Sequence, residues 1–88
     1  MVDGLEKEKA QIMFKLARKN NWGHKYDRLE HFKRFQHRDL IVKELSKQGW
    51  LLIYSKPNFL GISLNTEYKR NILNFIESHL PEFKGMIR

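Results

Sequence analysis

The sequence predicts one small α+β domain, built from three helices, a two-stranded β-hairpin and a C-terminal helix. Apolar residues recur at helical spacing through most of the first half of the chain. Two short apolar runs then flank a Pro57-Asn58 turn, and helical spacing returns before Pro81. A length of 88 residues suits one folding unit, and a hydrophobic share of 41% is enough for a core. We therefore treat residues 1–88 as a single domain.

The first predicted helix covers Leu5 to Asn20. Its apolar arc is formed by Leu5, Ile12, Met13, Leu16 and Ala17, and polar residues lie opposite. Asp3 and Glu6 have the spacing of a capping box at the start of a helix. Asn20 and Gly23 suit the left-handed conformations that end one.

A second helix is predicted from Asp27 to Phe35 and a third from Arg38 to Gln48, with a short break at Gln36-His37 between them. The apolar set of the second is Tyr26, Leu29, Phe32 and Phe35. The third places Ile41, Val42 and Leu45 on its inner side and a charged stripe of Asp39, Lys43 and Lys47 on its outer side. Gly49 is expected to close it as a C-cap.

The β-hairpin is predicted from two strands, Trp50 to Tyr54 and Phe59 to Leu64. The last helix is expected to begin at an Asn65 or Thr66 cap and to end at Pro81. Its core stripe is Tyr68, Ile72, Phe75, Ile76 and His79. The ordered part of the domain is thus predicted to be about residues 5–80, with 81–88 as a loose tail.

This order of elements resembles the winged helix-turn-helix superfamily, over about Leu5 to Leu80. Residues 37–51 (HRDLIVKELSKQGWL) look like a recognition helix that runs through a glycine into the first wing strand. Residues 61–65 (GISLN) look like the returning strand. The resemblance implies a domain that docks its third helix in the major groove of duplex DNA. Asp39 and Glu44 on that helix would lie poorly against phosphates unless they face bases or solvent.

The net charge of the chain also favours a nucleic-acid partner. Seventeen Lys and Arg against ten Asp and Glu give a net charge of +7, and such a field favours polyanions. The charge is concentrated between Lys15 and Lys47, where ten basic residues stand against four acidic ones, a difference of +6. Those basic residues are Lys15, Arg18, Lys19, Lys25, Arg28, Lys33, Arg34, Arg38, Lys43 and Lys47.

We therefore expect a nucleic-acid-binding protein, with duplex DNA favoured and a role in transcription regulation. The expected groove and phosphate contacts are Gln36, Arg38, Lys43, Lys47, Lys33 and Arg34, with Lys56 on the wing. A winged-helix module for protein interaction and an RNA-binding domain remain open alternatives. A stacking platform of Trp50, Tyr54 and Phe59 is a further possibility for single-stranded nucleic acid.

Little in the sequence points to an enzyme, a cofactor or a metal. The chain has no cysteine, which excludes disulfides and thiolate sites. His24, His31 and His37 are separated by seven and six residues, whereas a pair of metal-binding imidazoles on a helix needs a spacing of three or four. A small nuclease that uses one of these histidines as an acid or base rests on composition alone. No cofactor is expected.

Two further expectations concern location and assembly. The first residues lack the apolar stretch of a signal peptide, and the longest apolar run, Trp50 to Tyr54, is too short to cross a membrane. A cytoplasmic protein without membrane contact is therefore expected. A second apolar line on the last helix, formed by Leu73, Leu80 and Phe83, predicts a homodimer interface. Additional core packing is the competing account of that line.

Overall fold

The computed structural model describes the backbone of residues 2–85 and the side chains of residues 4–85. It has three α-helices, and these are α1 (Val2–Arg18), α2 (Arg38–Gln48) and α3 (Lys69–His79). A three-stranded sheet is formed by β1 (Asp27–Arg28), β2 (Leu51–Ser55) and β3 (Leu60–Leu64). Short 3-10 turns lie at η1 (Leu29–Phe32), η2 (Thr66–Tyr68) and η3 (Pro81–Phe83). The predicted α+β class is confirmed.

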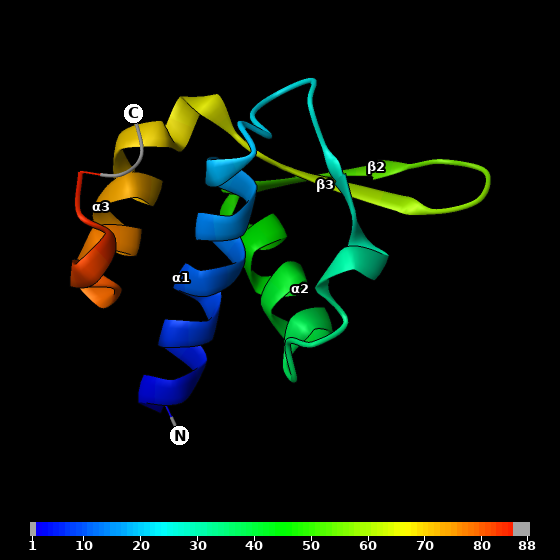
Figure 1. The fold of residues 1–88 in the computed structure, drawn as a ribbon. Coiled ribbons are helices and arrows are strands. Elements are labelled where there is room, and N and C mark those ends of the chain that lie inside the picture. The colour runs from blue at the N-terminus through cyan, green and yellow to red at the C-terminus, as the bar shows by residue number, and fades with distance from the viewer. Residues whose placement is uncertain (1, 86–88) are drawn as a thin grey trace.

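The sheet is antiparallel and has the order β1-β3-β2, with β3 in the middle. Leu51 pairs with Leu64 and Ile53 pairs with Ile62, which aligns β2 and β3 along their whole length. Asp27 pairs with Ile62 from the other side. The sheet therefore has three strands where the sequence predicted two. In Figure 1, β2 and β3 extend beyond α2 as a projecting arm.

The segment from Asp27 to Phe35 is not the α-helix that the sequence predicted. Its first two residues form β1, and the next four form the turn η1. The local apolar spacing favours a helix, but pairing of Asp27 and Arg28 with β3 requires an extended backbone at this point. Phe32 and Phe35 are buried as predicted, so the core contacts survive the change of conformation.

The prediction for α2 is confirmed from Arg38 to Gln48. Gly49 has a φ of 85°, and its backbone N–H donates to the carbonyl groups at the end of the helix. This left-handed conformation suits glycine, and the chain turns there directly into β2.

The other helix boundaries differ in part from the predictions. Helix α1 begins at Val2, so Asp3 lies inside the helix and not at a cap before it. Before α3, the side chain of Asn65 accepts a hydrogen bond from the Glu67 N–H, which identifies Asn65 as the cap of η2. The predicted tail begins with η3, and Met86 to Arg88 lie outside the described residues.

The core lies where α1 packs between α3 and α2 and against β3 (Figure 1). Its fully buried side chains come from every layer, and they include Ile12, Met13, Leu16, Phe32, Ile41, Leu45, Ile62, Leu64, Ile72, Ile76 and Leu80. Burial of large aliphatic groups of this kind stabilises a fold by about 1.5–3 kcal/mol for each side chain. The core thus holds α2 and the sheet in one fixed arrangement.

Candidate functional site

The outer face of α2 is the first surface that the charge pattern singled out. Ile41, Val42 and Leu45 are buried against the core, which leaves the opposite side of the helix exposed. That side carries Asp39, Leu40, Lys43, Lys47 and Gln48. Among residues 4–85, neither Lys43 nor Lys47 forms an ion pair. Two lysines therefore face solvent on one helical stripe.

Both carboxylates of α2 are held by neighbouring cations. Glu44 Oε1 lies 2.9 Å from the Nζ of Lys9 on α1, and Asp39 Oδ1 lies 3.0 Å from the Nε of Arg38. Lys9 also pairs with Glu6. Burial of Lys9 would lower its pKa, but the Glu44 and Glu6 carboxylates outweigh burial and raise it. The acidic residues of α2 are thus compensated within the chain.

The loop before α2 contributes Lys33, Arg34 and Gln36, all exposed. Lys33 and Gln36 line a hollow of about 390 Å³ at the start of α2, together with Arg38 and Leu40. Arg38 is partly buried, and its Nη1 donates to the carbonyl of Leu29 at 3.4 Å. Arg38 therefore ties η1 to α2, whereas Lys33, Arg34 and Gln36 remain open to a partner.

The hairpin arm carries Lys56 beside a group of aromatic rings. The Lys56 Nζ lies 5.4 Å from the centre of the Tyr26 ring and 5.9 Å from that of Tyr54. The guanidinium of Arg28 lies 4.2 Å from the centre of the Phe59 ring. These are cation–π contacts, and they place positive charge over the ring faces.

The predicted stacking platform is not assembled as expected. Trp50 packs edge-on against Phe75 of α3, away from the arm, while Tyr54 and Phe59 lie beside Tyr26. Cations already lie over these rings, so the ring faces are not free for a base to stack on. The arm therefore presents mainly positive charge to a partner.

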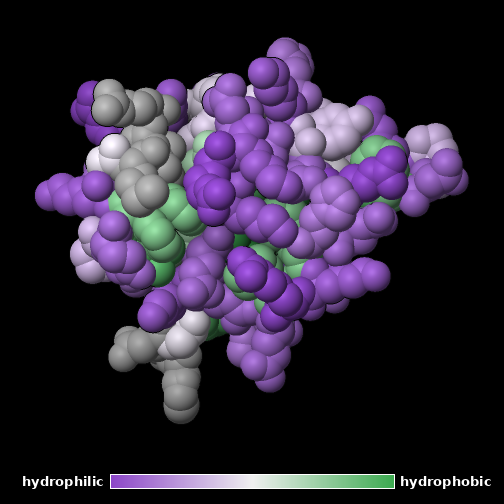
Figure 2. Space-filling view, in the orientation of Figure 1, coloured by the Kyte–Doolittle hydropathy of each residue, from purple (hydrophilic) through white to green (hydrophobic). Residues whose placement is uncertain are grey.

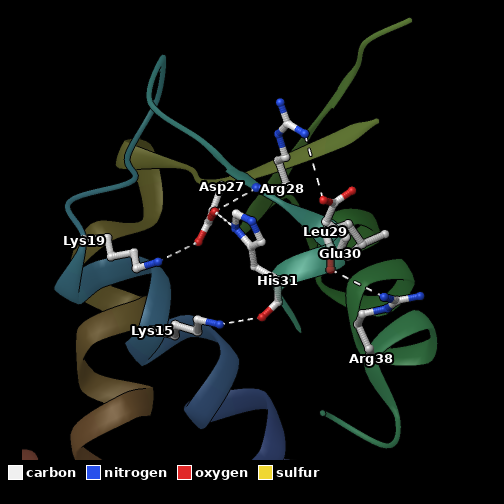
Figure 3. A network of polar contacts seen from close by, with 8 residues as sticks. All are labelled: Lys15, Lys19, Asp27, Arg28, Leu29, Glu30, His31 and Arg38. Atoms are coloured by element: carbon white, nitrogen blue, oxygen red, sulfur yellow. Dashed lines mark hydrogen bonds and ion pairs between the residues drawn. The ribbon is translucent and has the colours of Figure 1, made fainter. Parts of the chain in front are cut away.

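A polar network fixes the segment that joins α1 to α2 (Figure 3). The carboxylate of Asp27 accepts hydrogen bonds from the Arg28 N–H and from Lys19, and its Oδ1 lies 2.6 Å from His31 Nδ1. Lys15 donates to the carbonyl of His31. Burial would raise the pKa of Asp27, but His31, the Arg28 N–H and Lys19 together lower it. The network holds β1 and η1 against α1.

A groove of about 750 Å³ runs along α1. Its cations are Lys7, Lys15, Arg18, Lys19 and Arg34. Glu8 is its only carboxylate among the described residues, and it accepts hydrogen bonds from the backbone and the ring of His37 at 3.0 and 2.8 Å. Burial would raise the pKa of Glu8, but the His37 contacts lower it. Figure 2 shows mainly hydrophilic residues on the face where α1 lies, with hydrophobic ones between them.

The histidines are used separately. His31 contacts Asp27, His37 contacts Glu8, and His24 is exposed. Within residues 4–85, no three side chains of His, Asp or Glu come together in a way that could hold a metal ion.

The three predicted interface residues of the last helix pack within the chain. Leu80 is 1% exposed and belongs to the core. Phe83 stacks on Phe14 with ring centres 4.2 Å apart, and Leu73 packs against the same core. Leu80 therefore belongs to the core, as the competing account expects, whereas Leu73 and Phe83 are only partly buried and the homodimer stays a prediction.

Sequence reasoning missed three residues of these surfaces. Leu40 is 46% exposed on the outer face of α2, and its position one residue away from the buried arc was the available signal. Lys9 lies on the core side of α1 and pairs with Glu44 of α2. This role becomes visible only once the two helices are placed side by side. Tyr26 was assigned to the core of a helix, but it covers Gly61 on the arm.

Within the described helices, none has both the length and the apolar content needed to cross a membrane. Comparison of the chain with protein-family models, curated proteins and solved structures finds no significant match.

Proposed function

We propose that this protein binds nucleic acid, and that it docks the outer face of α2 on duplex DNA. Lys43 and Lys47 hold phosphates, and Gln36 and Leu40 lie where base edges or methyl groups would be met. Lys33 and Arg34 add phosphate contacts beside the start of the helix. Lys56 on the projecting arm reaches a neighbouring stretch of backbone.

The observation that carries this proposal is the compensation of the acidic residues of α2. Asp39 and Glu44 would repel phosphates if they were free, but Glu44 is paired with the buried Lys9, and Asp39, which is 81% exposed, is paired with its neighbour Arg38. Lys43 and Lys47 are exposed on the same helix. The outer face therefore combines two available positive charges with an exposed apolar side chain, Leu40. Positive charge of this kind supplies most of the affinity of non-specific binding.

We further propose that the domain is a winged helix. The support is the passage of α2 through Gly49 into β2 and β3, which form a projecting antiparallel arm. The domain departs from the expected pattern before α2, where β1 and η1 stand in place of an α-helix. Docking then depends on α2 and the arm, because η1 is too short to act as a supporting helix.

The test is the salt dependence of binding to duplex DNA, measured by fluorescence anisotropy. In the double variant Lys43→Gln/Lys47→Gln, the slope of log K against log salt should become shallower by about 1.8, at about 0.9 for each phosphate contact. The variant Lys69→Gln/Arg70→Gln removes the same charge from the first turn of α3 and serves as the control, with an expected slope near that of the wild type.

Two results would contradict the proposal. If the wild-type protein binds no duplex DNA at 50 mM salt, the nucleic-acid function is wrong. If both double variants lose affinity equally, the effect comes from net charge, and α2 is not the docking helix. Structured RNA in a parallel titration distinguishes an RNA-binding domain, which would bind the RNA more tightly at every salt concentration.

A docking site for another protein is a second candidate, and the arm favours it. Ile53 and Leu60 lie on the same face of the hairpin and are 44% and 42% exposed. Large apolar side chains that are exposed together are typical of protein interaction sites. The variant Ile53→Ser/Leu60→Ser should leave the salt slope of DNA binding unchanged if these residues serve a protein partner.

A further inference from the structure

The groove along α1 has the charge of an anion-binding surface. Five cations line it, and Glu8, its carboxylate among the described residues, is engaged by His37. Burial lowers the pKa of Lys15, and repulsion by Lys19 and Arg34 lowers it further, against the opposing effect of Asp27. An anionic occupant would relieve that repulsion.

The length of the cationic row indicates an extended occupant. The helix from Lys7 to Arg18 rises about 16 Å, at about 1.5 Å for each residue. One strand of a duplex carries a phosphate for every 3.4 Å of helix axis, so this length corresponds to about five phosphates. A single phosphate or carboxylate group would reach only one end of the row.

The floor of the groove indicates that the occupant is bound through its backbone. Phe14 and Phe35 line the groove, but each is only 7% exposed, and Phe83 is stacked on Phe14. Such rings present little face for a base to stack on. The groove therefore offers charges to phosphates and gives no sequence discrimination.

The groove lies next to the hollow at the start of α2. Phe35 and Gln36 line both of them, and Arg34 and Lys33 stand on either side of this junction. A polyanion that leaves the outer face of α2 would therefore meet the cations of α1 next.

We propose that the groove along α1 is a second nucleic-acid contact, which holds the phosphate backbone beside the segment that α2 docks. This inference rests on the nucleic-acid function proposed above. The nucleic acid would then contact the groove along α1 as well as the outer face of α2 and the arm. Lys7, Arg18 and Arg34 are its principal phosphate contacts, because Lys15 and Lys19 also hold the loop that contains β1.

The experiment compares three further double variants of the full chain with the wild type and Lys43→Gln/Lys47→Gln, by anisotropy on one duplex across a salt series. Lys7→Gln/Arg18→Gln should make the salt slope shallower by about 1.8 and weaken binding roughly 10- to 100-fold at 0.1 M salt. Lys7→Arg/Arg18→Lys keeps the charge and should bind like the wild type, which separates charge from packing. Lys69→Gln/Arg70→Gln is the control for net charge. Urea unfolding of each variant establishes that it folds.

The outcomes separate this inference from the function on which it rests. If the wild type and Lys43→Gln/Lys47→Gln behave as predicted while Lys7→Gln/Arg18→Gln keeps the wild-type slope, the groove is not a contact and the α2 proposal stands. If Lys7→Gln/Arg18→Gln has a shallower salt slope and Lys43→Gln/Lys47→Gln does not, the groove holds the nucleic acid and α2 does not. A wild type without affinity for nucleic acid overturns both.

Discussion

At the scale of single residues, Gly61 shows how a contact from a distant segment limits which residue a position can hold. A Cβ atom built on Gly61 would lie 2.5 Å from Cδ1 of Tyr26 and 3.0 Å from its Cγ. Gly61 also pairs with Tyr54 and Arg28 in the middle of the sheet. The absence of a side chain thus allows the Tyr26 ring to lie flat on the arm.

Gly61→Ala is expected to lower the free energy of unfolding by about 1–3 kcal/mol, because the methyl group forces the Tyr26 ring to move. Urea unfolding followed by circular dichroism measures the change. Gly4→Ala is the control, since nothing lies within 4 Å of a Cβ there, and alanine in α1 should be neutral or stabilise by up to about 1 kcal/mol. Equal stability of Gly61→Ala and the wild type would show that Tyr26 does not cover this strand.

Asp27 is the residue whose ionisation matters most to the loop between α1 and α2. Its pKa in the folded protein lies below the ordinary value, despite the opposing effect of burial, because His31, the Arg28 N–H and Lys19 favour the charged form. A group whose pKa is lowered by folding stabilises the fold above its unfolded pKa of about 3.9. That stabilisation is lost as the pH falls through the folded pKa.

The free energy of unfolding should therefore fall as the pH is lowered from about 5 to 2, and Asp27→Asn should show a smaller fall. The variant should also be less stable at pH 7 by about 1–3 kcal/mol, since it loses a charge-assisted network. Part of the pH dependence remains, because folding also lowers the pKa of Glu8. Asp39→Asn removes a carboxylate outside this network and is the comparison for the loss of one negative charge. An unchanged curve for Asp27→Asn would contradict the role of this network.

At the scale of elements, two polar contacts connect α1 to α2. Glu8 accepts hydrogen bonds from His37 at the start of α2, and Lys9 reaches Glu44 in its middle. Lys9 is only 8% exposed, so its charge depends on these carboxylates. The two contacts orient α2 against α1, and Lys9 offsets the charge of Glu44.

Lys9→Met should lower the free energy of unfolding by about 1–3 kcal/mol, because Glu6 and Glu44 lose their common partner. It should also weaken DNA binding beyond what the loss of one charge explains, since Lys9 no longer offsets the charge of Glu44 beside the proposed docking face. Adding Glu44→Gln to this variant should restore most of the binding without restoring the stability. Anisotropy and urea unfolding of the single and double variants check the two parts. If the double variant binds no better than Lys9→Met, the carboxylate of Glu44 does not affect docking.

The elements differ in how far the sequence predicted them. Helix α2 and its Gly49 cap were predicted to the residue, because an apolar arc and a terminal glycine are local signals. The strands β2 and β3 were predicted to within about one residue at each end for the same reason. The short segment β1 was missed, since two residues carry no periodic pattern and owe their conformation to β3.

At the scale of the whole molecule, the C-terminal residues complete the core of one chain. Leu80 is fully buried, and Phe83 covers Phe14 from η3. The cations lie mostly outside this core, along α1, on α2 and on the arm. The domain therefore presents positive charge at its surface, while most of its large apolar side chains lie in the core.

Leu80→Ala should lower the free energy of unfolding by about 2–5 kcal/mol, the usual cost of emptying a core position. Leu73→Ala should cost less, because Leu73 is partly exposed. Urea unfolding measures both. Sedimentation equilibrium of the two variants should give the same mass as the wild type, whereas a dimer held by these leucines would dissociate in both.

The sequence by itself determined the α+β class, the helices α1, α2 and α3, the strands β2 and β3 and the sign of the charge. Each of these is encoded locally, in apolar spacing, in turn residues or in a sum over the chain. Only the tertiary structure decided that β1 replaces a helix, that Lys9 and Arg38 hold the carboxylates of α2, and that Leu80 is internal. It also decided that cations of α1 and of the loop before α2 line one groove. These features join residues far apart in the chain, and their energies appear only once the core has brought the helices together.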